Sequence, residues 1–392
     1  MRSVVVTGLG AVSPFGVGVK AYWNGLAAGA CAIRPLTLIN ADGFRCRIAA
    51  EVPDGTGGSR RRSRADRLAL VAAGEALDDA GLDAANRADS AVIVGAVGGG
   101  MLEAEAWYWA RARGERPAGW AAALRAILPG SHADALGHRL RVGGPRHTVV
   151  TACSSGAVAL AEAAELVGDG VVDVALAGGV DAMTRMCFMG FNALKLLDPE
   201  PCRPFDRDRR GMSIGEGAAF VVLEAAERAR ARGARVYAEL AGHGMTTDAF
   251  HVTAPEPEGE GMVRAMRAAL AGARVGAGAV GYVNAHGTAT PQNDRIEARA
   301  IERVFGAGRL LVSSTKSMIG HTMAAAGALE AVATVLALTE ELLPPTATLV
   351  MPDPAVAFDC VPGAAREAAV ECAISNSFGF GGQNVTLLFR RA

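Results

Sequence analysis

Short runs of apolar residues alternate along the chain with alanine-rich segments. Apolar runs bounded by glycine or polar residues predict strands, and they lie at residues 4–8, 91–95, 147–150, 172–178, 218–223, 236–243, 280–285, 311–314, 372–375 and 385–389. Segments rich in alanine and leucine predict helices, and they lie at residues 67–80, 157–167, 262–271 and from about 320 to 338. This alternation predicts stacked layers of α/β structure.

The predicted elements fall into two halves of similar plan, and no strong linker separates them. We place the boundary between residues 235 and 236. An N-terminal half then covers residues 1–235, and a C-terminal half covers residues 236–392.

Composition supports a large globular protein. The chain has 392 residues, 51% of them hydrophobic, and a formal net charge of −1, which suffices for a sizeable core. No apolar stretch reaches the roughly 20 residues of a membrane span, and the first residues enter a strand directly, so we expect no targeting segment. The seven cysteines show no metal or disulfide pattern. We therefore expect a cytoplasmic protein without metal or membrane contact.

Cys153 is the first candidate for chemistry. It lies in Thr-Ala-Cys-Ser-Ser-Gly, between a predicted strand and a predicted helix. The N–H groups and positive dipole at a helix N-terminus favour a thiolate, so Cys153 is a candidate nucleophile. The alternative is a small buried cysteine that fills a tight turn.

Two histidines are candidate partners of this thiol. His286 follows a predicted strand, and His321 opens the predicted helix that ends near Leu338. A lone histidine in either place is more often structural. In α/β folds, however, polar groups at strand ends converge at one edge of the sheet, so a shared site is expected.

Four ordered blocks carry a resemblance to a known family. They are T-A-C-S-S-G at 151–156, N-A-H-G-T-A-T-P at 284–291, S-T-K-S-M-I-G-H at 314–321 and S-N-S-F-G-F-G-G-Q-N at 375–384. Together they resemble the elongating β-ketoacyl-acyl carrier protein synthases, and the match covers nearly the whole chain. The resemblance implies a thiolase-like fold with five α-β-α-β-α layers made from two related halves.

The resemblance also implies a reaction. An acyl group moves to Cys153, malonyl thioester loses carbon dioxide, and the resulting carbanion attacks the acyl group. His286 and His321 would stabilise the enolate with N–H bonds. The lysine that matches Lys316 lies close to the active site in the family, where its cation would tune the histidines. The alternatives for Lys316 are a structural pair with a nearby acid such as Glu330, which is compatible with tuning, and a direct role in proton transfer. This acyltransferase chemistry needs no cofactor apart from the phosphopantetheine arm of the acyl carrier protein.

Other residues take roles from the same resemblance. Thr288 and Thr290 would bind the phosphopantetheine arm, although they could equally cap a loop. Phe378 and Phe380 belong to a glycine-rich segment that would act as a gate, and the main-chain N–H groups of Phe380 and Cys153 would form an oxyanion hole. The alternative is a glycine-rich hairpin packed on the core. Gln383 stands where many relatives have threonine.

Partners are also implied. Arg64 and Arg203 fall near positions that dock the acyl carrier protein in the family, and Arg64 ends a basic run at 60–64. The run lacks the interleaved aromatic residues of a nucleic-acid platform. The resemblance further implies a dimer, made of two copies or of one copy and a chain-length-factor-like subunit.

The match is poorest at residues 107–129, where Trp107, Tyr108, Trp109 and Trp120 cluster among arginines. We expect this segment to form core or interface. Together with the residues Thr-Ala-Thr-Pro-Gln-Asn-Asp at 288–294, this segment is similar to synthases of the aryl-polyene and type II polyketide branch.

Three other functions would use a similar fold: a thiolase, a chain-length partner subunit and a decarboxylase. A thiolase needs a second cysteine in the C-terminal glycine loop, where this chain has Phe380. A chain-length partner lacks the nucleophile, and this chain has Cys153. A decarboxylase that never condenses stays open.

Overall fold

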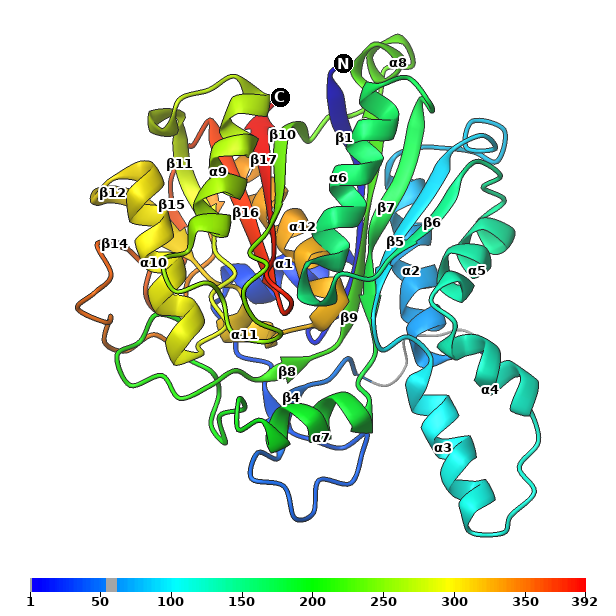
Figure 1. The fold of residues 1–392 in the computed structure, drawn as a ribbon. Helices are drawn as coiled ribbons and strands as arrows, with labels where there is room; N and C mark the ends of the chain where they lie inside the picture. Colours follow the sequence, from blue (N-terminus) through cyan, green and yellow to red (C-terminus); the bar gives the residue numbers. More distant parts are fainter. Residues whose placement is uncertain (1, 54–61) are drawn as a thin grey trace.

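The computed structural model describes residues 2–53 and 62–392. One continuous mixed β-sheet runs through the centre of the molecule (Figure 1). From the first half of the chain it takes β1 (Val4–Ser13), β2 (Gly16–Val17), β5 (Ala91–Ala96), β6 (Arg146–Val149), β7 (Val174–Asp181) and β9 (Gly217–Ala225). From the second half it takes β10 (Ala238–Thr247), β11 (Val280–Asn284), β12 (Gly308–Ser313), β14 (Phe358–Asp359), β16 (Cys372–Gly379) and β17 (Gln383–Arg391).

The two halves of this sheet repeat one topology. The order β6-β5-β7-β9-β1 corresponds, strand for strand along the chain, to β12-β11-β16-β17-β10. In each half the first two pairings are parallel and the next two are antiparallel. The half-sheets meet where β1 pairs with β10. This repetition fits the two related halves expected from the sequence, while the boundary at residues 235 and 236 stays a prediction.

Helices cover the sheet in layers. The helices are α1 (Val19–Ala27), α2 (Arg64–Asp79), α3 (Met101–Ala112), α4 (Trp120–Ile127), α5 (Gly130–Leu140), α6 (Ser155–Gly168), α7 (Arg185–Ala193), α8 (Ala226–Ala231), α9 (Glu260–Ala273), α10 (Pro291–Phe305), α11 (Lys316–Ile319) and α12 (Ala326–Thr339). Helices α6 and α12 lie between the half-sheets, with α2 and α5 outside the first half-sheet and α9 and α10 outside the second (Figure 1). These are the five layers expected from the sequence.

Smaller elements complete the fold. They are the 3-10 helices η1 (Ala152–Ser154), η2 (Ala277–Ala279) and η3 (Met323–Ala325), a sheet of β3 (Arg34–Pro35), β4 (Ile48–Ala50) and β8 (Ile214–Gly215), and the pair β13 (Leu342–Leu343) and β15 (Arg366–Glu367).

The central helices approach each other closely at glycines. A Cβ added to Gly156 in α6 would lie 2.6 Å from the Ala324 carbonyl oxygen, and one added to Gly327 in α12 would lie 2.7 Å from the Ala157 nitrogen. Both distances are far shorter than real Cβ contacts allow. The missing side chains therefore let the starts of α6 and α12 touch, which brings Cys153 close to the segment that carries His321.

The predicted strands are confirmed. Three of the four predicted helices are also confirmed, and they correspond to α2, α6 and α9 with ends shifted by a few residues. The fourth prediction was partly wrong, because α12 begins at Ala326 and not near Gly320. Gly320 has φ +65 and Met323 has φ +56, and these left-handed residues end α11 and bend the chain before α12 can start. Sequence patterns gave no prediction of α1, α3, α4, α5, α7 or α10.

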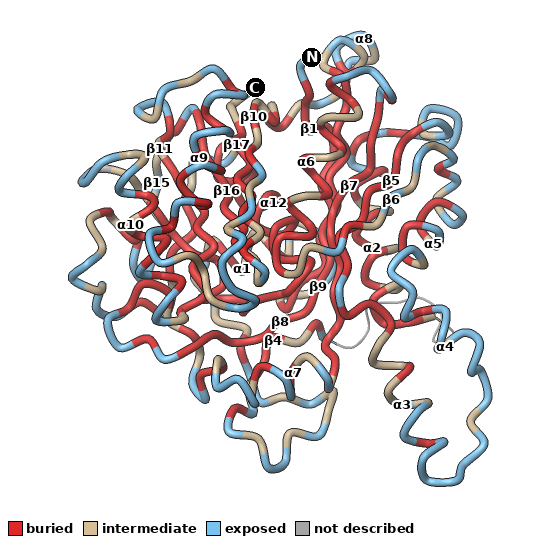
Figure 2. Tube along the Cα trace, viewed as in Figure 1, coloured by how far each residue is buried: buried red, intermediate tan, exposed pale blue. Residues whose placement is uncertain are grey.

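Helices α3 and α4 project from the body as a hairpin (Figures 1 and 2). Tyr108 is 63% exposed, Trp109 is 52% exposed and Trp120 is 60% exposed. Of the two expected roles, core or interface, the exposure of these side chains excludes the core, and the interface stays a prediction.

No helix within residues 2–53 and 62–392 is both long enough and apolar enough to cross a bilayer.

Candidate active site

Cys153 lies in η1, between β6 and α6, where the sequence placed it. The preceding residue, Ala152, has φ +51, a strained conformation for alanine that the surrounding packing must maintain. Gly379 lies close by, since a Cβ there would be 3.1 Å from the Thr151 carbonyl oxygen and 3.4 Å from the Cys153 nitrogen. The thiol is thus held on a tight turn against the end of β16.

The expected lowering of the thiol pKa is wrong. Burial raises the pKa of Cys153 to about 11, and it outweighs the opposing effects of the Phe380 N–H, the Lys316 charge and the Cys153 N–H. The helix N-terminus predicted a thiolate from local structure alone, whereas desolvation depends on the whole fold.

His286 follows β11, as predicted, and a buried carboxylate fixes its backbone. Glu297 in α10 accepts the N–H of His286 through Oε1 and the N–H of Gly287 through Oε2, each at 2.8 Å. Burial raises the pKa of Glu297 to about 7. The imidazole is held from the other side, because Lys316 Nζ lies 3.3 Å from Nδ1.

His321 lies between α11 and η3, and not at the start of α12. Its main chain bonds to the strand β8 segment, through Ser213 and Gly215. Its Nδ1 accepts the N–H of Met323 at 3.1 Å. The proton of a neutral ring is therefore on Nε2, which is buried without a hydrogen-bond partner in the described part of the chain.

The two imidazoles form a pair of neutral donors. Their ring centroids are 5.3 Å apart with planes at 87°. Burial lowers the pKa of both rings well below the usual value, and the Lys316 cation lowers each further. Because Lys316 donates to His286 Nδ1, the proton of neutral His286 is also on Nε2. Cys153, His286 and His321 line one cavity of about 320 Å³.

Lys316 lies beneath this cavity in an ion pair with Glu330 of α12, as the sequence expected. Both side chains are almost fully buried. Burial raises the pKa of Glu330 to about 7, and Lys316 opposes the rise. One lysine thereby contacts both a carboxylate and a histidine that lines the cavity.

Phe378 and Phe380 lie at the hairpin between β16 and β17, so the glycine-rich segment is a hairpin, and it lies next to Cys153. Phe378 packs near the His286 ring, with centroids 6.0 Å apart. Phe380 lies 5.7 Å from the Phe191 ring of α7. Both phenylalanines line the cavity, which fits the expected gate, although movement stays a prediction.

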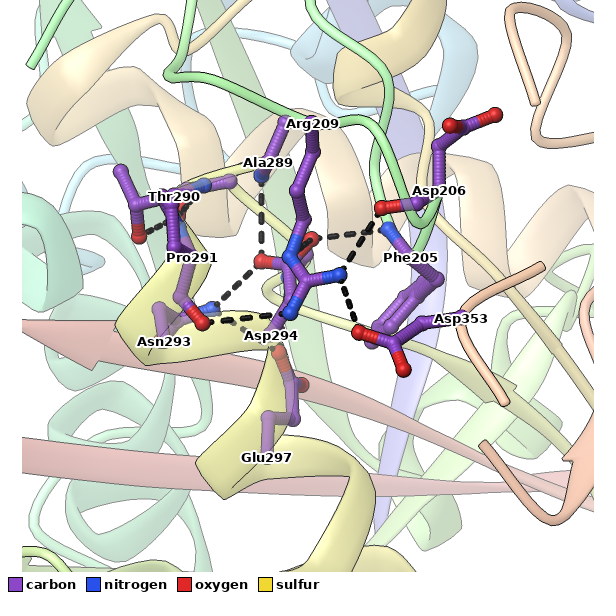
Figure 3. Close-up of polar contacts among 12 residues, drawn as sticks. Phe205, Asp206, Arg209, Ala289, Thr290, Pro291, Asn293, Asp294, Glu297 and Asp353 are labelled. Atoms are coloured by element: carbon purple, nitrogen blue, oxygen red, sulfur yellow. Dashed lines mark hydrogen bonds and ion pairs between the residues drawn. The ribbon is translucent and has the colours of Figure 1, made fainter. Parts of the chain in front are cut away.

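Thr288 and Thr290 also line the cavity, and their hydroxyl oxygens are 3.0 Å apart. The loop that carries them is held by α10 (Figure 3): Asp294 Oδ1 accepts the N–H of Ala289, and Oδ2 accepts the N–H of Phe205. Sequence reasoning missed Asp294 and Glu297. Their signal was a proline at the first turn of a helix followed by acids three residues apart.

Arg209 closes this network from the other side (Figure 3). It donates to Asp353 at 2.7 Å and to the carbonyl oxygens of Asp206 and Pro291. Burial raises the pKa of Asp294, which the nearby Arg209 opposes. The loop after His286 is thus supported by buried charges.

Comparisons with known proteins agree with the motifs. Residues 1–229 match the family described as Beta-ketoacyl synthase, N-terminal domain, and residues 237–350 match Beta-ketoacyl synthase, C-terminal domain. The chain belongs to the β-ketoacyl synthase family. The predicted family, its acyltransferase class and the thiolase-like fold are therefore confirmed.

Relatives of this synthase match over its full length. It is 41% identical to 3-oxoacyl-[acyl-carrier-protein] synthase 2 of Rhizobium meliloti, covering 100% of this chain and 99% of the relative. Among solved structures, "The ishigamide ketosynthase/chain length factor" has a TM-score of 0.95 at 37% identity, covering 100% and 99% of the two chains. A ketosynthase in complex with its chain length factor from Xenorhabdus doucetiae has a TM-score of 0.87 at 30% identity, covering 100% and 98%.

Carrier docking through Arg64 is a prediction that the structure contradicts. Arg64 is only 4% exposed, and its Nε and Nη2 donate to Glu216 at 2.9 and 2.5 Å. A buried bidentate pair is not available to a partner. Arg60 and Arg61 of the basic run lie outside the described residues. Arg203 is half-buried and donates to the Asp208 carbonyl oxygen.

Arg64→Ala is expected to destabilise the synthase strongly. The substitution leaves the buried Glu216 charge unpaired, which costs about 3–5 kcal/mol of unfolding free energy. Denaturant unfolding checks this, with Arg203→Ala as the control that changes stability far less. A loss below about 1 kcal/mol for Arg64→Ala would show that the pair is not structural.

Proposed function

We propose that this synthase is an elongating ketosynthase that joins malonyl and acyl groups by decarboxylative Claisen condensation. The observation that carries the proposal is a single cavity lined by a thiol and two neutral N–H donors, Cys153, His286 and His321. Those are the groups needed to hold an acyl thioester and to stabilise an enolate.

In the first step the Cys153 sulfur attacks the acyl thioester of a carrier protein. A new C–S bond forms, the old C–S bond breaks, and the thiol proton passes to the departing phosphopantetheine thiol. Although burial outweighs them, the main-chain N–H groups of Phe380 and Cys153 are close enough to the sulfur to lower the pKa of the thiol. They stabilise the negative carbonyl oxygen of the tetrahedral intermediate.

In the second step malonyl carrier protein loses carbon dioxide. The electron pair of the broken C–C bond becomes an enolate, whose oxygen accepts the Nε2–H bonds of His286 and His321. The enolate carbon then attacks the acyl carbonyl on Cys153 and releases the sulfur as a thiolate, giving β-ketoacyl carrier protein. The thiolate takes up one proton from solvent, which restores the thiol. Neutral imidazoles suit this role because they donate hydrogen bonds to the enolate but are much weaker acids than an imidazolium, so they do not protonate the enolate carbon before it attacks.

Lys316 acts on this step through His286. Its ammonium group donates to Nδ1 and disfavours a second positive charge on the ring. Glu330 balances the lysine charge in the core. Lys316 is thus assigned to tuning the histidines, and not to proton transfer.

Substrates and partners follow from the same proposal. The substrates are thioesters on the phosphopantetheine arm of acyl carrier protein, with Thr288 and Thr290 binding the arm and Arg203 docking the carrier. No separate cofactor is proposed. A second ketosynthase-fold chain, identical or chain-length-factor-like, is proposed as the dimer partner, supported by the complex from Xenorhabdus doucetiae and by the exposed aromatic residues of α3 and α4.

The test is product analysis after mixing the purified protein with octanoyl and malonyl carrier proteins. The proposal expects β-ketodecanoyl carrier protein and carbon dioxide in equal amounts. Carbon dioxide without the β-keto product would favour the decarboxylase reading, and absence of both would refute the proposal. The rates at which the enzyme extends saturated and polyunsaturated acyl carriers, measured side by side, would distinguish fatty-acid elongation from polyene elongation.

Alkylation of Cys153 is expected to rise with pH without a plateau between pH 7 and 9.5. Burial raises the pKa of the thiol to about 11, so only about one molecule in ten thousand carries the thiolate at pH 7, and this fraction grows about tenfold per pH unit. Iodoacetamide labelling followed by peptide mass spectrometry measures the rate. A plateau below pH 8 would show that the local N–H donors outweigh burial.

A further inference from the structure

Asp181 ends β7, where one buried carboxylate gathers three main-chain donors. It is 2% exposed and does not line the cavity. Its Oδ1 accepts the N–H groups of Gly98 and Gly99 at 2.6 and 3.1 Å, and its Oδ2 accepts the N–H of Ala324 at 3.0 Å. The carboxylate thus joins the loop after β5 to the η3 turn.

The η3 turn fixes the orientation of His321. Met323, next to Ala324, donates its N–H to His321 Nδ1, which leaves the proton on Nε2. Met323 also has φ +56, and such a conformation persists only when surrounding contacts maintain it. The Ala324–Asp181 bond is one such contact, made at the adjacent peptide.

We propose that Asp181 is a positioning residue for the decarboxylation step, which holds the η3 turn so that His321 presents Nε2–H to the enolate. The inference rests on the proposed function. Asp181 touches neither substrate nor the His321 ring and acts through the Ala324 and Met323 peptides.

The same carboxylate reaches the base of the α3–α4 hairpin. Gly98 and Gly99 precede α3, and Gly99 has φ +50. A Cβ at Gly99 would lie 2.6 Å from Nε2 of the buried His132 in α5, so this loop is confined on both sides. Asp181 therefore links the loop before the projecting hairpin to the turn of the catalytic-site histidine.

Asp181→Asn separates the two half-reactions. The amide keeps the volume, but its NH₂ group faces N–H donors, so one of the two loops loses its acceptor. Malonyl carrier protein decarboxylation is expected to fall about 10- to 100-fold, as misplaced catalytic groups do. Cys153 alkylation should not slow, because the Asp181 charge raises the pKa of Cys153 and its removal favours the thiolate.

A double-mutant cycle with His321→Ala tests the route of the effect. If Asp181 acts through His321, Asp181→Asn causes no further loss of decarboxylation in the His321→Ala background. Glu75→Gln is the matched control: Glu75 is a half-buried carboxylate in α2 that accepts the N–H groups of Ala11 and Val19 away from the cavity. It should leave both half-reactions unchanged.

Equal loss of decarboxylation and Cys153 alkylation, an additive loss in the His321→Ala background, or an unchanged decarboxylation rate would each overturn the proposal. If Asp181→Asn does not fold, Asp181→Glu keeps the charge and both acceptors on a longer arm, and its decarboxylation should fall while alkylation is retained. The unmodified protein runs in every assay. If the unmodified protein does not decarboxylate malonyl carrier protein, the proposed function is refuted. If it does and Asp181→Asn decarboxylates at the same rate, only the role of Asp181 is refuted.

Discussion

Replacing Cys153 with alanine is expected to abolish capture of an acyl group and to lower condensation by roughly 10⁴-fold or more, since loss of a nucleophile removes the covalent route. The rest of the cavity stays in place, because alanine fills most of the same volume. Intact-protein mass spectrometry after incubation with octanoyl carrier protein measures the effect. The unmodified protein should gain one octanoyl group, and Cys153→Ala should gain none.

Cys372→Ala is the control for this variant. Cys372 is a buried cysteine at the start of β16, outside the cavity lining, and its removal should leave acylation intact. Malonyl decarboxylation should survive in Cys153→Ala, because the two histidines carry that step. An octanoyl group that still attaches to Cys153→Ala would place the nucleophile elsewhere.

His321→Ala is expected to lower malonyl decarboxylation and condensation by on the order of 100- to 1000-fold, the usual effect of losing one oxyanion donor. Octanoyl transfer to Cys153 should stay within about threefold of the unmodified rate, because its oxyanion is stabilised by the Cys153 and Phe380 peptides. Release of labelled carbon dioxide and protein mass give the two rates separately.

His243→Ala serves as the matched histidine control. His243 in β10 pairs with Glu165 at 2.9 Å and does not line the cavity, so both rates should be nearly unchanged. Parallel loss of both half-reactions in His321→Ala would mean that the ring supports the cavity as a whole and does not serve the enolate.

Much of the fold could be predicted because strands and nucleophile turn carry local signals. The apolar runs ending at His286 and preceding Cys153 marked strand ends, and strand ends of one sheet edge meet in space. The start of α12 was misplaced because Gly320 and Met323 adopt left-handed conformations. Methionine is not a residue type that marks a left-handed conformation, so the sequence around Met323 does not indicate the bend before α12.

Charged groups were harder to place from sequence. Arg64 stands at the end of an arginine run that looks solvated. Its partner Glu216 lies far along the chain, and the two side chains pair in the interior of the protein. Asp294 and Glu297 look like the polar face of a helix, yet they accept main-chain N–H groups of the His286 loop. Such pairings follow from tertiary contacts and leave no local pattern.

The thiol of Cys153 shows the same limit in its energetics. A helix N-terminus is visible in sequence, and it does favour a thiolate. The degree of burial is not visible, and burial dominates the pKa of this thiol.

A crystal structure of the synthase with an octanoyl group on Cys153 would show whether the thiol, the two imidazoles and the peptide N–H groups serve one thioester. We expect the acyl carbonyl oxygen within hydrogen-bonding distance of the Cys153 and Phe380 nitrogens, with Nε2 of His286 and His321 facing the space beside the thioester. A carbonyl oxygen directed away from those nitrogens, or either imidazole turned out of the cavity, would contradict it.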